Sequence, residues 1–227
     1  MHYVMSDLHG EKDRFDAMLK LINFSIEDKL FILGDVLDRG PEPIALLRQI
    51  MSMPNVQMLL GNHEHMCLEY YKVDPEPVAI RRWDKNNNQV TKDGLASLTV
   101  FQRAEVFDYM KNLPLNLEIE VAGKKYHLVH GFVGDNLHDQ VWGRPYDCTQ
   151  KPFEDTTVII GHKPVIEFIE RDEEKQMQIL ESLAKENKHL EILYSPYFIN
   201  IDCCCGYDVP AKALACLRLE DMKQFYC

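Results

Sequence analysis

The first third of the chain alternates short apolar runs with amphipathic segments. Residues 2–5, 29–33 and 56–60 are largely apolar, and the run at 29–33 suits a strand that is covered on both faces. Between them, apolar side chains recur at helical spacing, at positions 15, 18, 19 and 22 and again at 44, 47, 50 and 51. We therefore predict a helix from about residue 11 and another that opens at Pro41, because proline is tolerated in a first helical turn. This order is typical of a βαβ unit.

The rest of the chain changes to a pattern dominated by strands. Residues 65–113 are interpreted as mostly helical, and residues 115–121 and 125–129 as a hairpin that turns at residues 122–124. Residues 158–160, 198–202 and 214–219 predict further strands, whereas the charged segment 170–190 predicts an exposed helix. From this order we expect a single α/β domain over residues 1–227, built as a two-sheet sandwich that is flanked by helices.

Five polar clusters each follow an apolar run. They are Asp7-Leu8-His9-Gly10, Gly34-Asp35-Val36-Leu37-Asp38-Arg39-Gly40, Gly61-Asn62-His63-Glu64, His130-Gly131 and Gly161-His162. Because open α/β sheets place their ligands at the carboxyl ends of strands, we expect these clusters to meet at one edge.

The clusters supply the residue types that a two-metal phosphoester hydrolase needs. A phosphate ester repels nucleophiles through its own charge, and two metal ions roughly 3.5–4 Å apart neutralise its oxygens and activate a water. Aspartate oxygens and imidazole nitrogens together suit Mn, Fe or Zn. Taken alone, an Asp-x-His cluster is more often a turn or a helix cap than a pair of metal ligands, and a lone histidine can simply end a strand. The joint occurrence of the clusters, in order, favours a metal site.

Composition narrows the class of protein further. The chain has 227 residues and a formal net charge of −11, with a pI near 5.3, so it lacks the basic face that nonspecific nucleic-acid binding requires. It shows no signal-peptide pattern and no apolar run long enough to span a bilayer. The seven cysteines, three of them consecutive, do not resemble a disulfide framework. We expect a cytoplasmic protein without membrane or nucleic-acid partners.

The ordered clusters resemble those of the calcineurin-like metallophosphoesterases, and more narrowly the bacterial and phage branch of the phosphoprotein Ser/Thr phosphatases. The resemblance runs from about residue 3 to residue 219. It implies an enzyme that hydrolyses phosphomonoesters, most plausibly phosphoserine and phosphothreonine in a protein or peptide, by direct attack of a metal-bridging hydroxide. It also implies two metal ions, with Mn preferred over Fe or Zn. Relative to shorter relatives, the charged helix near residues 170–190 resembles an insertion.

The resemblance implies a role for each cluster residue. Asp7 and His9 would hold one metal, Asp35 would bridge both, and Asn62, His130 and His162 would hold the other. His63 would be the general acid, with Asp38 orienting its ring, and Arg39 and Arg144 would grip the phosphate. Arg144 is included because Val141-Trp142-Gly143-Arg144 resembles the Trp-x-Arg stretch of the family.

Three positions depart from the family pattern and leave substrate preference open. Phe132 follows His130-Gly131, Lys163 replaces the usual threonine after His162, and Cys203-Cys204-Cys205 follows Ile201-Asp202 where the family tends to read Thr-Gly. The nearest alternative is a symmetrical dinucleoside-tetraphosphate hydrolase. That branch tends to carry Ala at the position of Asp38 and Asp at that of Glu64, so both residues favour the protein phosphatase.

A phosphodiesterase and a noncatalytic phosphoprotein-binding scaffold are further alternatives. The scaffold would be expected to have lost metal ligands or His63, and this chain retains them all. We assign packing roles to Trp83 and the Tyr70-Tyr71 pair, and interpret the consecutive cysteines as small buried residues. We assign structural roles to His2, His65, His127, His138 and His189, and a helix-start or supporting role to Glu64.

Overall fold

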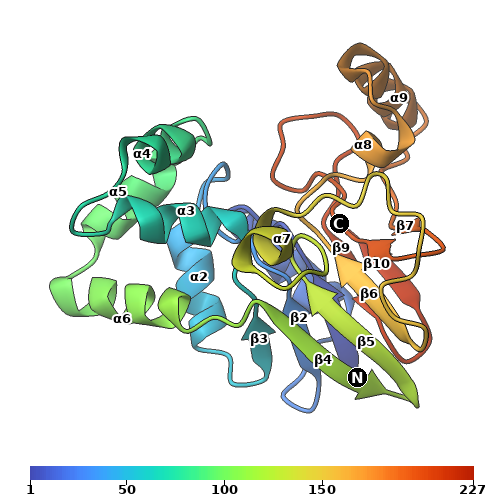
Figure 1. The fold of residues 1–227 in the computed structure, drawn as a ribbon, viewed down its shortest axis with the longest axis horizontal. Coiled ribbons are helices and arrows are strands. Elements are labelled where there is room, and N and C mark those ends of the chain that lie inside the picture. The colour runs from blue at the N-terminus through green and yellow to red at the C-terminus, as the bar shows by residue number, and fades with distance from the viewer.

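Two five-stranded β-sheets form the centre of the molecule in a computed structural model that describes residues 1–227 (Figure 1). The strands are β1 (His2–Met5), β2 (Lys29–Ile32), β3 (Val56–Met58), β4 (Asn116–Val121), β5 (Lys124–Val129), β6 (Thr156–Ile160), β7 (Leu193–Tyr194), β8 (Ile199–Asn200), β9 (Ala215–Arg218) and β10 (Lys223–Tyr226). The first sheet has the order β10-β9-β1-β2-β3, and the second has the order β4-β5-β6-β8-β7. The predicted sandwich is confirmed.

Helices cover the sheets and build two projecting groups. They are α1 (Lys12–Leu21), α2 (Pro43–Met51), α3 (Asn62–Tyr70), α4 (Pro77–Asp84), α5 (Gln89–Ser97), α6 (Val100–Lys111), α7 (Leu137–Trp142), α8 (Ile166–Ile169) and α9 (Glu173–Lys185). In Figure 1, α3 to α6 gather on the left, whereas α8 and α9 rise at the upper right. The helix predicted in the charged segment 170–190 is α9. None of the helices combines the length and apolar character needed to cross a bilayer.

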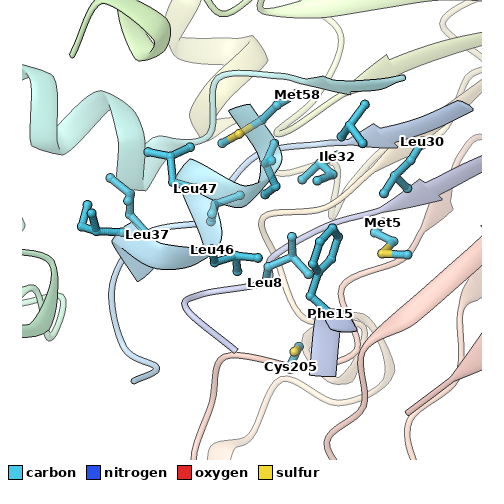
Figure 2. Close-up of a cluster of buried hydrophobic side chains, with 14 of the residues drawn as sticks. Met5, Leu8, Phe15, Leu30, Ile32, Leu37, Leu46, Leu47, Met58 and Cys205 are labelled. Atoms are coloured by element: carbon cyan, nitrogen blue, oxygen red, sulfur yellow. The ribbon is translucent and has the colours of Figure 1, made fainter. Parts of the chain in front are cut away.

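The core lies in layers on both faces of the first sheet. Alternate residues of β2 point to opposite faces, so Leu30 and Ile32 join α1 and α2, whereas Phe31 packs between the two sheets. Figure 2 shows the outer layer, in which Phe15 of α1 and Leu47 of α2 lie over the strands. Burying one such side chain contributes roughly 1.5–3 kcal/mol, which explains the continuous apolar run at residues 29–33.

Some boundaries differ from the prediction. The second helix begins at Pro43 and not at Pro41. Gly40 and Glu42 donate their backbone N–H groups to the carbonyls of His9 and Gly10, and this pairing keeps the segment extended before the helix starts. β7 and β10 were not predicted. β7 has only two residues, which is too short to show a periodic pattern.

Candidate active site

Parallel strands deliver the predicted metal ligands to one edge of the sandwich. β1, β2 and β3 are parallel neighbours in the first sheet, and β5, β6 and β8 are parallel neighbours in the second. Asp7, Asp35 and Asn62 follow the first three strands, while His130 and His162 follow β5 and β6. Asn62 is also the first residue of α3, so the third cluster opens a helix, in agreement with the helix-start role considered for Glu64.

These side chains meet around Asp35. Its carboxylate oxygens lie 3.7 Å from His9 Nε2, 3.8 Å from His63 Nε2 and 3.3 Å from His130 Nε2. Asn62 Oδ1 lies 2.9 Å from His130 Nε2 and 2.7 Å from His162 Nδ1. Asp7 Oδ1 is 4.0 Å from His9 Nε2, and Asp7 Oδ2 accepts the backbone N–H of His162 at 3.0 Å. We call the six residues Asp7, His9, Asp35, Asn62, His130 and His162 the ligand cage.

Backbone carbonyls orient two of the cage histidines. His9 Nδ1 donates to the carbonyl of Leu37 at 2.9 Å, and His130 Nδ1 donates to that of Leu33 at 2.8 Å. This pairing assigns the proton to Nδ1 and turns Nε2 toward the cage, as is usual for metal-ligating imidazoles. His162 Nε2 is buried and has no hydrogen-bond partner.

The cage fits a pair of metal ions by these observations. Two groups of ligand atoms lie close enough for one ion each, His9–Asp35–His63 and Asp35–His130–His162, and Asp35 is common to both. The first group includes His63, which lies outside the cage and is the expected general acid. Carboxylate, amide and imidazole donors together suit Mn, Fe or Zn. Bound there, two ions would neutralise phosphate oxygens and lower the pKa of a water.

Asp38 holds His63 from the side away from the cage. His63 Nδ1 lies 2.6 Å from Asp38 Oδ2, and the same carboxylate accepts Trp83 Nε1–H at 2.7 Å and Thr91 Oγ1–H at 2.6 Å. All four side chains are almost fully buried. Asp38 can thereby fix the ring in one orientation, with Nε2 directed toward the cage, as a general acid requires. Trp83 is fully buried in the core, which agrees with the packing role expected for it, and its indole N–H in addition donates to Asp38.

The two predicted phosphate arginines lie in different settings. Arg39 is close to the cage, with Nη1 2.9 Å from His9 Nε2 and Nη2 3.2 Å from His63 Nε2. Its guanidinium stacks on the ring of Tyr207 at 4.2 Å from the ring centroid, a contact that was not predicted from the sequence. Arg144 is exposed after α7 and makes no hydrogen bond or ion pair, so the structure places it beside the cage and not in it.

Glu64 supports the loop that carries Asp35. Its carboxylate accepts the backbone N–H groups of Asp35, Val36 and Leu37 at 2.9–3.0 Å, and that of Gly61 at 3.1 Å. Burial and the charge of Asp35 raise the pKa of Glu64 to about 7, while the backbone donors oppose this rise. This agrees with the supporting role expected for Glu64.

The backbone at the site is strained and closely packed. Positive φ angles occur at Asp7, His9, Asp35, Asp38, Arg39 and His162, where L residues rarely adopt them. Such strain persists only where surrounding structure enforces it, and it concentrates at functional sites. A Cβ atom on Gly61 would collide with Asp35, and one on Gly161 would collide with Ser6 and Asp7. Glycine at these two positions therefore lets the clusters approach one another.

Burial and the charges of neighbouring residues shift the pKa values of the cage residues in different directions. Burial would raise the pKa of Asp35, but the charges of His130 and His63 hold it well below its usual range. Burial opposes the charge on His130, yet Asp35 raises the pKa of His130 to about 9. Burial, reinforced by His130, lowers the pKa of His162, and burial raises that of Asp7. The metal-free cage therefore contains an ion pair between Asp35 and His130.

One further polar residue at this edge, Asp202, was not proposed from the sequence. Asp202 follows β8, is 1% exposed, and has one carboxylate oxygen without a hydrogen-bond partner. Burial, reinforced by the charge of Asp7, raises the pKa of Asp202 well above its usual range. The available signal was a short apolar run that ends in an aspartate, as in the other clusters.

The match to known proteins agrees with this geometry. A family model described as calcineurin-like phosphoesterase matches residues 3–194. The chain belongs to the calcineurin-like phosphoesterase family. The chain also has the fold of a metallophosphoesterase from Sphaerobacter thermophilus, with a TM-score of 0.55, 18% identity and coverage of 99% of this chain and 85% of the other.

Two curated relatives of this phosphoesterase share one name, symmetrical bis(5'-nucleosyl)-tetraphosphatase. The protein from Wigglesworthia glossinidia brevipalpis is 41% identical over 75 residues, which are 32% of this chain and 28% of the relative. The protein from Acidovorax sp. (strain JS42) is 31% identical over 134 residues, which are 58% of this chain and 43% of the relative. The match therefore spans less than half the length of either relative.

Proposed function

We propose that this phosphoesterase hydrolyses symmetrical dinucleoside tetraphosphates, the function that was the alternative on sequence grounds. The names of the curated relatives support this substrate more directly than a phosphoprotein. The observation in the structure that carries the proposal is a set of cations on two sides of the cage. A tetraphosphate chain bears more negative charge than a phosphate monoester and extends further, so it can use cations on both sides.

These cations come from separate parts of the chain. Arg39 lies against His9 and His63 on one side. Lys163 follows His162 on the other side, and its Nζ forms an ion pair with Glu167 at 2.9 Å, which a polyphosphate would have to replace. Burial and the charge of His130 lower the pKa of His162, and the charges of Lys163 and Arg144 add to this effect. Asn200 Nδ2 donates to the carbonyl of Lys163 at 2.7 Å, and this bond fixes the backbone there. Lys163 is also a position at which the chain departs from the Ser/Thr phosphatase pattern.

A second candidate is the hydrolysis of phosphoserine and phosphothreonine in proteins. The contact between Asp38 and His63 favours it, because a serine or threonine oxygen is a strongly basic leaving group that requires a proton from a general acid. The nucleoside diphosphate that leaves a tetraphosphate is far less basic and depends less on such a proton. An intact acid pair is therefore more useful for ester cleavage than for anhydride cleavage.

The protein residues divide the work in either reaction. Arg39 binds phosphate oxygens as a planar fork. His63, oriented by Asp38, donates its proton to the leaving oxygen, which is an alkoxide oxygen in the phosphoprotein reaction and a phosphate oxygen in the tetraphosphate reaction. Glu64 holds the Asp35 loop in place. All seven cysteines are free thiols, which supports the cytoplasmic setting expected from the sequence.

One experiment separates the two substrates. The Mn²⁺-loaded protein is given a dinucleoside tetraphosphate and a phosphoserine peptide in parallel, and nucleoside diphosphate and phosphate are measured. A higher kcat/KM for the tetraphosphate supports the first candidate, and the reverse order replaces it with the second. Lys163→Thr should lower kcat/KM for the tetraphosphate about tenfold, which corresponds to one charge contact of about 1.4 kcal/mol, and leave the peptide unaffected.

A noncatalytic scaffold is tested in the same series. Folded protein that turns over neither substrate with any divalent metal, yet binds phosphopeptide, would replace both enzymatic proposals. A metal content near two ions per chain would argue against the scaffold. Asp35→Asn is the control for contaminating phosphatase, because any activity that survives in this variant does not come from the cage.

A further inference from the structure

The last parallel strand ends at the cage without a residue assigned to it. Five parallel strands supply the ligand cage, and β8 is the sixth. β8 pairs with β6 in the register Ile160 to Asn200, so Asp202 follows β8 at the level at which His162 follows β6. Asp202 thus occupies, on β8, the position that a cage ligand occupies on the neighbouring strand.

The carboxylate of Asp202 is fixed but only half satisfied. Its Oδ1 accepts the backbone N–H of Cys204 at 3.0 Å, and its backbone carbonyl accepts that of Val165 at 2.9 Å. Its Oδ2 is buried and has no partner. A buried carboxylate oxygen has lost its hydrogen bonds to water, and this costs free energy unless a donor or a cation replaces the water. Unpaired oxygens of this kind are therefore rare in folded proteins. This oxygen is therefore suited to a partner that binds after folding.

The surroundings indicate where that partner lies. The charged groups that act on Asp202 include Asp7, Arg39 and Asp35, all of them at the cage. The chain that follows Asp202 stays on the same side, because a Cβ atom on Gly206 would collide with the ring of His9. The segment of residues 202–207 therefore lines the part of the cage that Asp7 and His9 form.

We propose that Asp202 is a further carboxylate of the metal centre, whose free Oδ2 stabilises the cation on the side of Asp7 and His9. The cage carries few negative groups for two cations, since only Asp7 and Asp35 among its six residues are acidic. A third carboxylate next to Asp7 adds the charge that a divalent ion attracts, and supporting carboxylates of this kind raise metal affinity about 10–100-fold. The inference rests on the metal centre and not on the identity of the substrate.

The test compares Asp202, which has an unpaired oxygen near the cage, with Asp28, a buried aspartate whose carboxylate is hydrogen-bonded within the protein. Asp28 is 9% exposed and lies far from the cage, and its carboxylate accepts hydrogen bonds from the N-terminal amine at 2.7 Å and from Ser25. Full-length wild type, Asp202→Asn and Asp28→Asn are freed of metal with a chelator and titrated with Mn²⁺. The free Mn²⁺ is followed by electron paramagnetic resonance, and melting temperatures are measured before and after loading.

We expect Asp202→Asn to weaken binding of one Mn²⁺ about 10–100-fold and to melt no lower than wild type without metal. Asp28→Asn should melt lower and bind Mn²⁺ as wild type does. Unchanged Mn²⁺ affinity in Asp202→Asn overturns the inference, and so does a metal-free melting temperature well below wild type, which marks Asp202 as a purely structural residue. If wild type itself binds no Mn²⁺, Fe²⁺ or Zn²⁺, the whole metal centre fails, and this outcome is distinct from the first two.

Discussion

Two buried aspartates, Asp38 and Asp202, lie on either side of the cage and differ in the hydrogen bonds that their carboxylate oxygens accept. Asp38 accepts hydrogen bonds from His63, Trp83 and Thr91, so both of its oxygens are satisfied by the protein alone. Asp202 is equally buried, yet its Oδ2 has no partner. The hydrogen bonds around Asp38 and His63 are therefore complete in the folded protein. At the cage, by contrast, cations are required to balance the negative charge of the carboxylates. Variants on the two sides should consequently fail in different ways.

The largest effect is expected at Asp35, which both potential metal groups share. Asp35→Asn should abolish turnover and Mn²⁺ binding together, with a loss beyond the ~10²–10⁴ that a single general acid contributes. The measurements are kcat/KM and metal content after dialysis. A variant that retains two ions per chain would show that Asp35 does not bridge them.

His63→Asn tests the general acid by itself. We expect the metal content to stay unchanged and kcat to fall by about 10²-fold or more, because the leaving oxygen departs without a proton. The loss should be larger for a phosphoserine peptide than for p-nitrophenyl phosphate, whose leaving group is less basic. Equal losses on both substrates would contradict the role of His63 as the acid.

Thr91→Val probes the support of Asp38 with little change in shape. The variant removes the hydroxyl that donates to Asp38 Oδ1 and accepts the backbone N–H of Asp38 at 2.9 Å. Leaving these buried groups unpaired should lower the free energy of unfolding by about 1–3 kcal/mol, as measured by urea denaturation. Thr91→Ser retains the hydroxyl but loses the methyl group and is the control, so it should be destabilised less than Thr91→Val. Equal destabilisation of both variants would contradict the importance of the hydroxyl contacts.

The smallest effect concerns the pH dependence of the metal-free protein. His130 has a pKa of about 9, above its ordinary value of 6.5, because Asp35 outweighs the effect of burial. A raised pKa means that this ion pair stabilises the fold fully below about pH 6.5, and that the contribution is lost as pH rises toward 9. Melting temperatures of metal-free wild type should fall across this range more steeply than those of His130→Asn. Parallel curves for the two proteins would contradict the prediction.

Most residues of the cage could be predicted from the sequence, because each cluster directly follows a strand and parallel strands end at one edge of the sheet. It could not show the partners of Asp38. Trp83 and Thr91 lie on α4 and α5, about 50 residues further along the chain, and only the packing of those helices brings them to Asp38. The roles assigned to the cage residues and to Arg144 remain predictions that the variants above can test.

Asp202 escaped notice for a different reason. It was placed inside the predicted strand of residues 198–202, and so was not treated as a polar residue that follows a strand. In the structure β8 ends at Asn200, and Asp202 lies beyond it. The start of the second helix was misplaced by two residues because long-range backbone hydrogen bonds, and not local preference, decide where Pro41 lies.

The hydrogen bond from the backbone of His162 to Asp7 has a consequence for biosynthesis. It joins residues that are 155 positions apart and closes the site across both sheets. A ribosome releases the first three strands well before residue 162, so the growing polypeptide carries half of the site for much of its translation. Hydrolytic capacity can therefore arise only late, once the second sheet has left the exit tunnel and docked onto the first.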